Sequence, residues 1–184
     1  MFLSSFQFNK INSIKKSIGD YKFIEHNYSF RGKSNKRYLV IVEEYQYSIF
    51  IVKFCLQERK IYSDRFNHLT KLNECSRVFT TIGEIIKKIH NDNPFASFGF
   101  IGSNLPGENK INTKRFRIYR KIVTQVISPV HFEHRESPNN SAYLLLNRDS
   151  NYPDLFEKAI EMFQNIYLEI TNPLTSPPSP HPTQ

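Results

Sequence analysis

Three short, largely apolar runs in the first third of the chain predict three β-strands. The runs cover Tyr21–Phe30, Arg37–Tyr45 and Tyr47–Leu56, and they are rich in aromatic and β-branched residues. Because only a few residues separate one run from the next, the pattern is typical of antiparallel neighbours in one sheet. Residues 1–20 space their apolar side chains at nearly a helical interval, which predicts a short helix that ends at Gly19.

The rest of the chain alternates helical and strand patterns. Polar residues 57–76 predict a long loop or a short helix, and residues 80–91 predict a helix that begins with a capping box of Thr81 and Glu84. An apolar strand follows at Phe95–Gly102, and then a basic helix that Asn112 or Thr113 would cap.

A strand pair and a last helix complete the expected domain. The strands cover His131–Glu136 and Ser141–Asn147, and the helix covers Pro153–Thr171. We therefore expect one α+β domain over residues 1–171, with three antiparallel strands, helix, strand, basic helix, two-strand hairpin and C-terminal helix. The proline-rich residues 172–184 predict a disordered tail.

The basic helix has two unlike sides. At about 100° per residue its apolar side chains share one arc, which is expected to face the core: Phe116, Ile118, Tyr119, Ile122, Val123 and Val126. Lys114, Arg117 and Lys121 share the opposite side, with Arg120 at its border. Arg115 falls inside the apolar arc, where either its stem covers apolar surface or its guanidinium grips a carboxylate or phosphate group.

Charge and composition indicate which partners, metals and membranes the protein is expected to bind. The net charge of +8 favours an anionic partner, although a solvated lysine-rich surface would have the same composition. Cys55 and Cys75 have no metal-ligand spacing, and His131 and His134 would face opposite sides of a strand, so no metal site is expected. No apolar run spans a membrane and no secretory leader is visible, so we expect a cytoplasmic protein without membrane contact.

The order of elements over residues 21–147 resembles the core of the GNAT superfamily, the N-acetyltransferases that use acetyl-CoA. Within the basic helix, Asn112, Tyr119 and Lys121 match the family pattern N-x-x-A-x-x-x-Y-x-K, while Arg115 stands at the alanine position. The run R-F-R-I-Y-R at residues 115–120 also resembles one in small uncharacterised bacterial proteins. The resemblance implies a GNAT-like mixed sheet.

The resemblance also implies where a cofactor would bind. In the family, the pyrophosphate of acetyl-CoA lies on a loop [QR]-x-x-G-x-[GA], whose glycines let backbone N–H groups approach the phosphates. The matching register makes Arg77, Thr80 and Thr81 the candidate cofactor-binding residues. Thr80 and Ile82 stand at the small positions, and no glycine occurs between Gly32 and Gly83. We therefore expect acetyl-CoA binding to be lost.

Three hypotheses for function follow. The first is a non-catalytic binding or accessory protein whose basic helix contacts an acidic protein or nucleic acid through Lys114, Arg115, Arg117, Arg120 and Lys121. The second is a divergent N-acyltransferase in which Tyr119, at the position of the family's general acid, protonates the departing thiolate; its alternative role is an aromatic core residue. The third is a subunit of a bacterial toxin-antitoxin or defence system.

Overall fold

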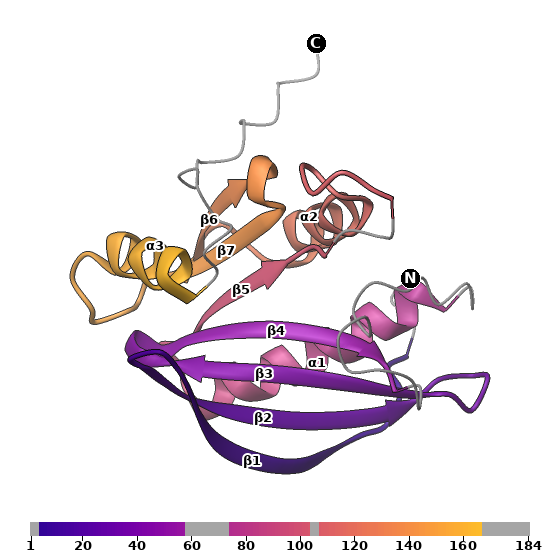
Figure 1. Cartoon of the computed structure of the whole chain (residues 1–184). Helices are drawn as coiled ribbons and strands as arrows, with labels where there is room; N and C mark the ends of the chain where they lie inside the picture. The colour runs from indigo at the N-terminus through magenta and orange to yellow at the C-terminus, as the bar shows by residue number, and fades with distance from the viewer. Residues whose placement is uncertain (1–3, 58–73, 104–106, 167–184) are drawn as a thin grey trace.

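A mixed, seven-stranded sheet is the framework of the protein (Figure 1). This computed structural model describes residues 4–57, 74–103 and 107–166. Within these residues the strand order is β1-β2-β3-β4-β5-β7-β6, and the α+β class expected from the sequence is confirmed. The elements are β1 (Phe8–Ile18), β2 (Tyr21–Arg31), β3 (Arg37–Tyr45), β4 (Ile49–Leu56), α1 (Cys75–Asp92), β5 (Ser97–Ile101), α2 (Lys114–Val126), β6 (Phe132–Ser137), β7 (Ala142–Asn147) and α3 (Leu155–Ile166).

The prediction of a helix in residues 1–20 is wrong, because residues 8–18 of this segment form the edge strand β1. Its pairing with β2 shifts by one residue between Lys10 and Asn12, which leaves Ile11 as a bulge. A bulge interrupts the two-residue alternation of a strand. Apolar residues at positions 8, 11 and 14 therefore imitate a helical interval in the sequence.

Strands β2, β3 and β4 confirm the three predicted strands. The third begins at Ile49 rather than Tyr47, because residues Gln46–Ser48 form a short 3-10 turn. Tyr47 and Ser48 have positive φ angles of 60° and 55° in this turn. Non-glycine residues seldom adopt this conformation, so residue type alone does not indicate the turn.

Helix α1 confirms the predicted helix but starts five residues earlier than Thr80, at Cys75. The expected capping box of Thr81 and Glu84 is wrong. Thr81 lies within the helix, fully buried, and its hydroxyl donates to the Arg77 carbonyl oxygen at 2.8 Å. The residue spacing predicts one apolar face formed by Val78, Ile82, Ile85, Ile86 and Ile89, and all of these except the partly buried Ile86 are buried.

The second half of the chain adds β5, α2, the β6–β7 hairpin and α3. Strand β5 pairs with β4 in parallel and with β7 antiparallel, so β7 lies between β5 and β6. Thr113 is the cap of α2, because its hydroxyl oxygen accepts from the Phe116 N–H at 3.2 Å. The end of the last predicted helix, from residue 167, and the expected tail at residues 172–184 lie outside the described residues.

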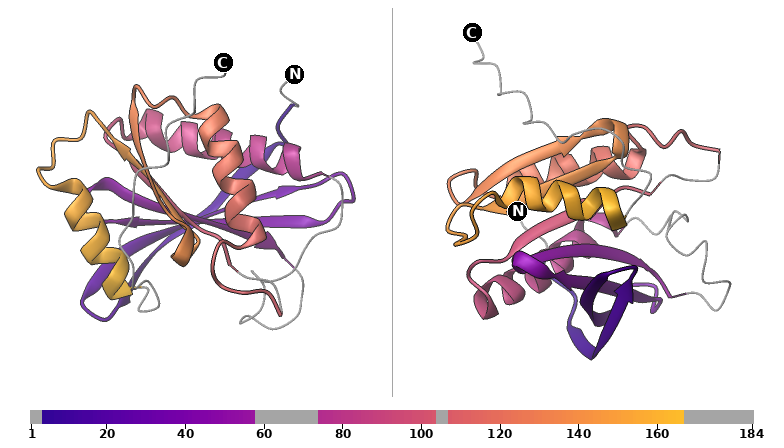
Figure 2. Two further views of the ribbon diagram at one scale, coloured as in Figure 1. Left: turned by 90° about the horizontal axis from the view of Figure 1, so that it is seen from above. Right: turned by 60° about the vertical axis from the view of Figure 1, so that its left-hand side comes forward.

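Two apolar cores lie on opposite faces of the sheet. Val40, Val42 and Phe98 belong to the core beneath α1 and α2, whereas Ile49, Ile51 and Leu144 belong to the core beneath α3. Alternate residues of one strand face opposite sides, so each central strand contributes to both cores. In the view from above, α1 and α3 lie on the two sides of the strands (Figure 2).

Candidate functional site

Strands β4 and β5 separate toward their carboxyl ends. Their pairing runs from Ile49 opposite Ser97 to Val52 opposite Phe100, while residues 53–56 of β4 continue to pair with β3. Figure 1 shows β5 rising away from β4 beyond this point. Ligands commonly bind at the carboxyl ends of parallel strands. The place where the two strands part, beyond the pair Val52–Phe100 and here called the sheet opening, is therefore the position at which a small ligand would be expected.

Three aromatic rings from three elements meet beside the sheet opening. Phe54 of β4 lies 5.5 Å from Phe79 of α1 and 5.7 Å from Tyr119 of α2, measured between ring centroids. Phe79 and Tyr119 are 5.4 Å apart, edge to face. Burial raises the pKa of the Tyr119 hydroxyl, against the opposing effect of the nearby Arg115. These contacts make Tyr119 part of the wall of the core.

The candidate cofactor-binding residues lie inside α1 rather than in a loop before it. Arg77 stacks on the Phe6 ring at 4.1 Å and donates to the Ser5 carbonyl oxygen at 3.3 Å. The Thr80 hydroxyl donates to the Ser76 carbonyl oxygen at 3.0 Å. The Thr81 hydroxyl oxygen accepts from the Phe6 N–H at 2.9 Å. All three side chains thus bind neighbouring parts of this chain.

Glu74, directly before α1, is a buried carboxylate that sequence reasoning missed. Its oxygens accept from the Tyr38 hydroxyl at 2.8 Å and from the Lys33 backbone N–H at 2.7 Å. A side-chain carbon at Gly32 would lie only 2.3 Å from the same carboxylate. Glu74 therefore ties the turn between β2 and β3 to the beginning of α1, in a contact over 41 residues that no local pattern predicts.

The beginning of α2 is anchored to the end of β5. The Thr113 hydroxyl donates to the Gly102 carbonyl oxygen at 2.7 Å, and the Thr113 N–H donates to the Ser141 hydroxyl at 2.9 Å. A side-chain carbon at Gly102 would lie 2.6 Å from the Phe116 backbone nitrogen. The Glu108 carboxylate accepts from the Lys114 N–H at 2.6 Å, where the helix dipole favours a negative charge.

Three of the five candidate partner-binding residues form an exposed row on α2. Lys114, Arg117 and Lys121 are all exposed, while Phe116 and Val123 on the opposite side are buried. The Arg117 guanidinium donates to the Asn112 carbonyl oxygen at 2.5 Å. We call Lys114, Arg117 and Lys121 the basic row.

The other two candidates are engaged with this chain. The Arg120 guanidinium pairs with the Glu136 carboxylate at 2.7 Å, and the Glu136 side chain is 4% exposed. Burial raises the pKa of Glu136, although Arg120 opposes that effect. Arg115 is half-buried beside Tyr119, and its charge acts on that hydroxyl. Arg120 and Arg115 therefore border the basic row without extending it.

A histidine of β6 and a tyrosine of β7 are hydrogen-bonded to each other across the hairpin. His134 Nδ1 lies 2.8 Å from the hydroxyl of Tyr143, whose ring is almost fully buried. Burial lowers the pKa of His134, and it raises the pKa of Tyr143 to about 12. Burial thus favours a neutral His134. His131 lies just outside β6 and contributes its carbonyl oxygen to Arg148 N–H at 3.0 Å.

Two carboxylates lie opposite each other on β2 and β3, on the face that bears α3. Glu25 pairs with Glu43 in the strand register, and each has its own lysine: Lys16 at 2.6 Å and Lys53 at 2.7 Å. Like charges directly opposite each other destabilise a sheet, so the two lysines offset this repulsion. Glu43 is only 6% exposed. Each carboxylate is matched by one ammonium group.

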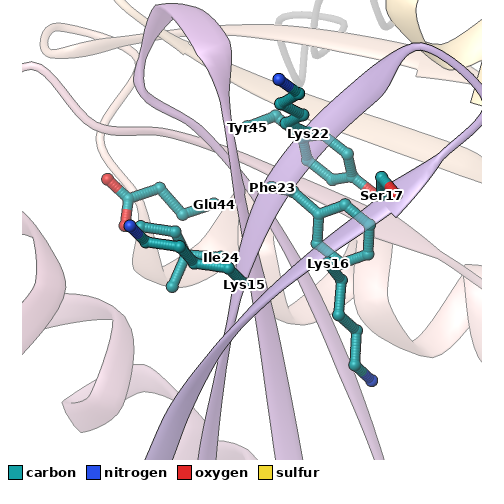
Figure 3. A pocket seen from close by; sticks show the side chains of 8 residues that line it. All are labelled: Lys15, Lys16, Ser17, Lys22, Phe23, Ile24, Glu44 and Tyr45. Atoms are coloured by element: carbon teal, nitrogen blue, oxygen red, sulfur yellow. The ribbon is translucent and has the colours of Figure 1, made fainter.

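Two shallow hollows lie away from the sheet opening. One, of about 350 Å³, borders the β2 and β3 ends near Arg31 and Arg37. The other, of about 520 Å³, lies around the turn between β1 and β2 (Figure 3). Figure 3 shows that its three lysines, Lys15, Lys16 and Lys22, point in different directions. They therefore do not converge on one ligand.

Searches of the described residues find neither a metal-ligand cluster nor a membrane-spanning helix. In residues 4–57, 74–103 and 107–166 there is no group of three or more His, Cys, Asp or Glu side chains suited to a metal ion. No helix in the same part of the chain is long and apolar enough to cross a membrane. Comparisons with protein-family models, with curated proteins and with solved structures find no match.

Proposed function

We propose that the chain is a non-catalytic binding module with a GNAT-like core, and that its basic row contacts an acidic surface of a partner protein. The observation that carries the proposal is the exposure of Lys114, Arg117 and Lys121 on one side of a helix whose other side is buried. Such a helix can present charge to a partner without disturbing its own packing.

The order of elements supports the GNAT-like part of the proposal. Strands β2 to β4, helix α1, strand β5, helix α2 and the β6–β7 hairpin follow one another in the order on which the resemblance is based. Tyr119 of α2 packs against Phe54 of β4, beside the sheet opening. Strand β1 lies outside the resemblance, at the edge of the sheet.

The anchoring of α2 supports a role in recognition. From Lys114 to Lys121 the row spans about 10 Å of helix, at 1.5 Å per residue. The contacts of Thr113 with Gly102 and Ser141 hold the start of this helix against β5 and the hairpin. A row of charges on a fixed helix loses little conformational freedom of the backbone when a partner binds.

The residues around α2 favour a protein over nucleic acid. Exposed aliphatic side chains lie before and after the helix and at its end: Ile111 is 53% exposed, Val126 55% and Val130 72%. The expectation that Val126 faces the core is therefore wrong, because it lies at the last residue of α2. Protein interfaces combine apolar side chains with a charged rim, and arginine is enriched in them. Nucleic acids are bound mainly through phosphate contacts and through stacking on aromatic rings, which aliphatic side chains do not provide.

A charge-reversal experiment tests the proposal. Lys114, Arg117 and Lys121 are all changed to Glu, and the control changes Lys33, Arg37 and Lys87, which are also exposed, to Glu. Both variants lose two lysines and one arginine, so their net charge is the same. The probe is an Asp- and Glu-rich peptide interrupted by prolines, because such a peptide cannot add to a sheet edge.

Fluorescence anisotropy of the labelled peptide should show binding about tenfold weaker or more for the basic-row variant, and little change for the control. Equal loss in both variants would contradict the proposal, since only overall charge would then matter. Preferential binding of duplex or single-stranded oligonucleotides through the basic row would replace the protein partner by nucleic acid.

A second candidate function is a divergent N-acyltransferase that uses acetyl-CoA, and the position of Tyr119 on α2 is the observation that favours it. It would take Tyr119 as the general acid, with Arg77, Thr80 and Thr81 near the cofactor. The contacts of those three side chains within the chain speak against that role. A place in a bacterial toxin-antitoxin or defence operon, and a cytoplasmic location, stay predictions from the sequence.

A further inference from the structure

Strand β1 forms one edge of the sheet and leaves its outer side without a neighbouring strand among the described residues. It has 11 residues, and all of them except Phe8 are exposed. At about 3.4 Å per residue such an edge is about 37 Å long. In an antiparallel pair every second residue turns its N–H and C=O groups away from its partner strand. These outward groups can accept a further strand.

The exposed side chains of β1 include three isoleucines. Ile11 is 52% exposed, Ile14 42% and Ile18 43%. The strand register places Ile14 and Ile18 on the same face as Lys16, while Lys10 and Lys15 lie on the other face and Ile11 forms the bulge. Edge strands are commonly protected by lysines and bulges, and β1 has both. Protection alone does not account for three exposed β-branched residues on one strand.

The charges of β1 select the kind of strand that can pair with it. The strand contains Lys10, Lys15 and Lys16 and no acidic residue. Two copies paired antiparallel about the central Ser13 would bring Lys10 of each opposite Lys16 of the other, and like charges opposite each other are unfavourable. Lys16 already pairs with Glu25 at 2.6 Å and keeps 43% of its side chain exposed. A strand that carries carboxylates, rather than a second copy, therefore complements this edge.

We propose that the edge of β1 binds an extended acidic segment of a partner protein, which adds to the sheet as an antiparallel strand next to β1. Its aliphatic residues lie opposite Ile14 and Ile18, and its carboxylates lie opposite Lys15 and Lys16. Read along the partner, this gives apolar, polar, acidic, acidic, apolar. The inference goes beyond the basic row, because β1 and the β6–β7 hairpin next to α2 lie at opposite edges of the sheet.

The probe is a synthetic peptide with this pattern, V-T-E-E-V-T-S-V-E. One control peptide replaces each Glu by Lys, and another replaces the central Val by Pro, which cannot donate a ladder hydrogen bond. Binding is followed by amide NMR and by hydrogen exchange on the full chain. The acidic peptide should shift the amide signals of residues 8–18 and slow exchange at every second amide of β1. Both control peptides should bind at least about tenfold more weakly.

Two protein variants locate the site. Lys10→Glu with Lys15→Glu reverses two exposed charges of β1 and leaves the Lys16–Glu25 pair in place, whereas Lys33→Glu with Lys87→Glu makes the same charge change elsewhere. Circular dichroism should show both variants folded. The β1 variant should lose at least about tenfold in peptide affinity, and the other variant, like the basic-row variant, should keep it.

Several outcomes would overturn the inference. They are amide shifts confined to α2, equal binding of the acidic, lysine and proline peptides, and no binding of any of them. A concentration-dependent dimer that the β1 variant abolishes in sedimentation experiments would assign the edge to a second copy instead. Loss of peptide binding with an intact basic-row interaction would leave the proposed function standing.

Discussion

Tyr119 of α2 has a packing role in the structure. Its ring contacts Phe54 and Phe79, which belong to β4 and α1, so three elements meet at this residue. Offset and edge-to-face ring pairs stabilise by about 0.5–1.5 kcal/mol beyond their buried area. Burial raises the pKa of its hydroxyl above the ordinary tyrosine value, which favours the neutral form further. The ring, rather than the hydroxyl, is the part that the fold uses.

Two substitutions separate these parts of Tyr119. Tyr119→Phe keeps the ring, so we expect little change in the free energy of unfolding. Tyr119→Ala removes the ring and should cost about 2–3 kcal/mol, less than for a fully buried aromatic residue, because Tyr119 is only partly buried. Urea denaturation measures both values. Tyr152→Ala, at a tyrosine that is 40% exposed, is the control and should cost less. A loss as large for Phe as for Ala would mean that the hydroxyl itself has a structural or chemical role.

Among the elements, the junction between β5 and α2 fixes the position of the basic row, because the two elements are in direct backbone contact there. Gly102 lies against the Phe116 backbone, and Thr113 bonds to the Gly102 carbonyl oxygen. A helix whose first turn is fixed in this way holds its exposed side in a constant direction relative to the sheet. Gly83, inside helix α1, offers a contrast to Gly102, because a side-chain carbon there would meet no atom within 4 Å.

This contrast predicts opposite effects of the same substitution. Gly83→Ala should stabilise the protein by about 0.5–1 kcal/mol, because alanine loses less conformational entropy than glycine in a helix. Gly102→Ala should destabilise it by about 1–3 kcal/mol, because backbone atoms of Phe116 would have to move. Thermal denaturation of the two variants checks both signs. A neutral Gly102→Ala would show that α2 can shift away from β5, and that its position is not fixed by this contact.

At the scale of the whole molecule, the sheet presents two different edges and one internal opening. Strand β1 lies at one edge with three lysines and three exposed isoleucines, and the β6–β7 hairpin lies at the other, next to α2. Between them, β4 and β5 separate where rings from β4, α1 and α2 gather. The two surfaces proposed for binding are thus on the outside, whereas packed aromatic rings lie beside the place where β4 and β5 part.

The lining of the sheet opening and the helical state of residues 77–82 predict that acetyl-CoA does not bind. Isothermal titration calorimetry with millimolar acetyl-CoA should show no heat of binding beyond dilution. The control titrates free CoA, so that binding through the nucleotide alone is recognised. A dissociation constant in the low micromolar range would contradict the prediction and make the N-acyltransferase the first candidate function.

The sequence by itself determined the elements whose patterns are local. Strands β2 to β4, the apolar face of α1, a cap at Asn112 or Thr113 and the exposure of Lys114, Arg117 and Lys121 all follow from residue spacing and turn chemistry. These features depend on neighbours within a few positions of one another. Periodicity therefore predicts them without knowledge of the fold.

The remaining features depend on contacts between residues far apart in the chain, so they become visible only in the folded protein. The bulge at Ile11 interrupts the alternation of residues in β1, so the sequence pattern did not indicate a strand there. Strand β1 is an edge because no strand lies beyond it among the described residues. Glu136, paired with Arg120, and Glu74, bound by the Lys33 backbone N–H, are buried carboxylates that a sequence would count as surface charges. The gathering of Phe54, Phe79 and Tyr119 likewise joins residues up to 65 positions apart, and burial of their rings, not their spacing, brings them together.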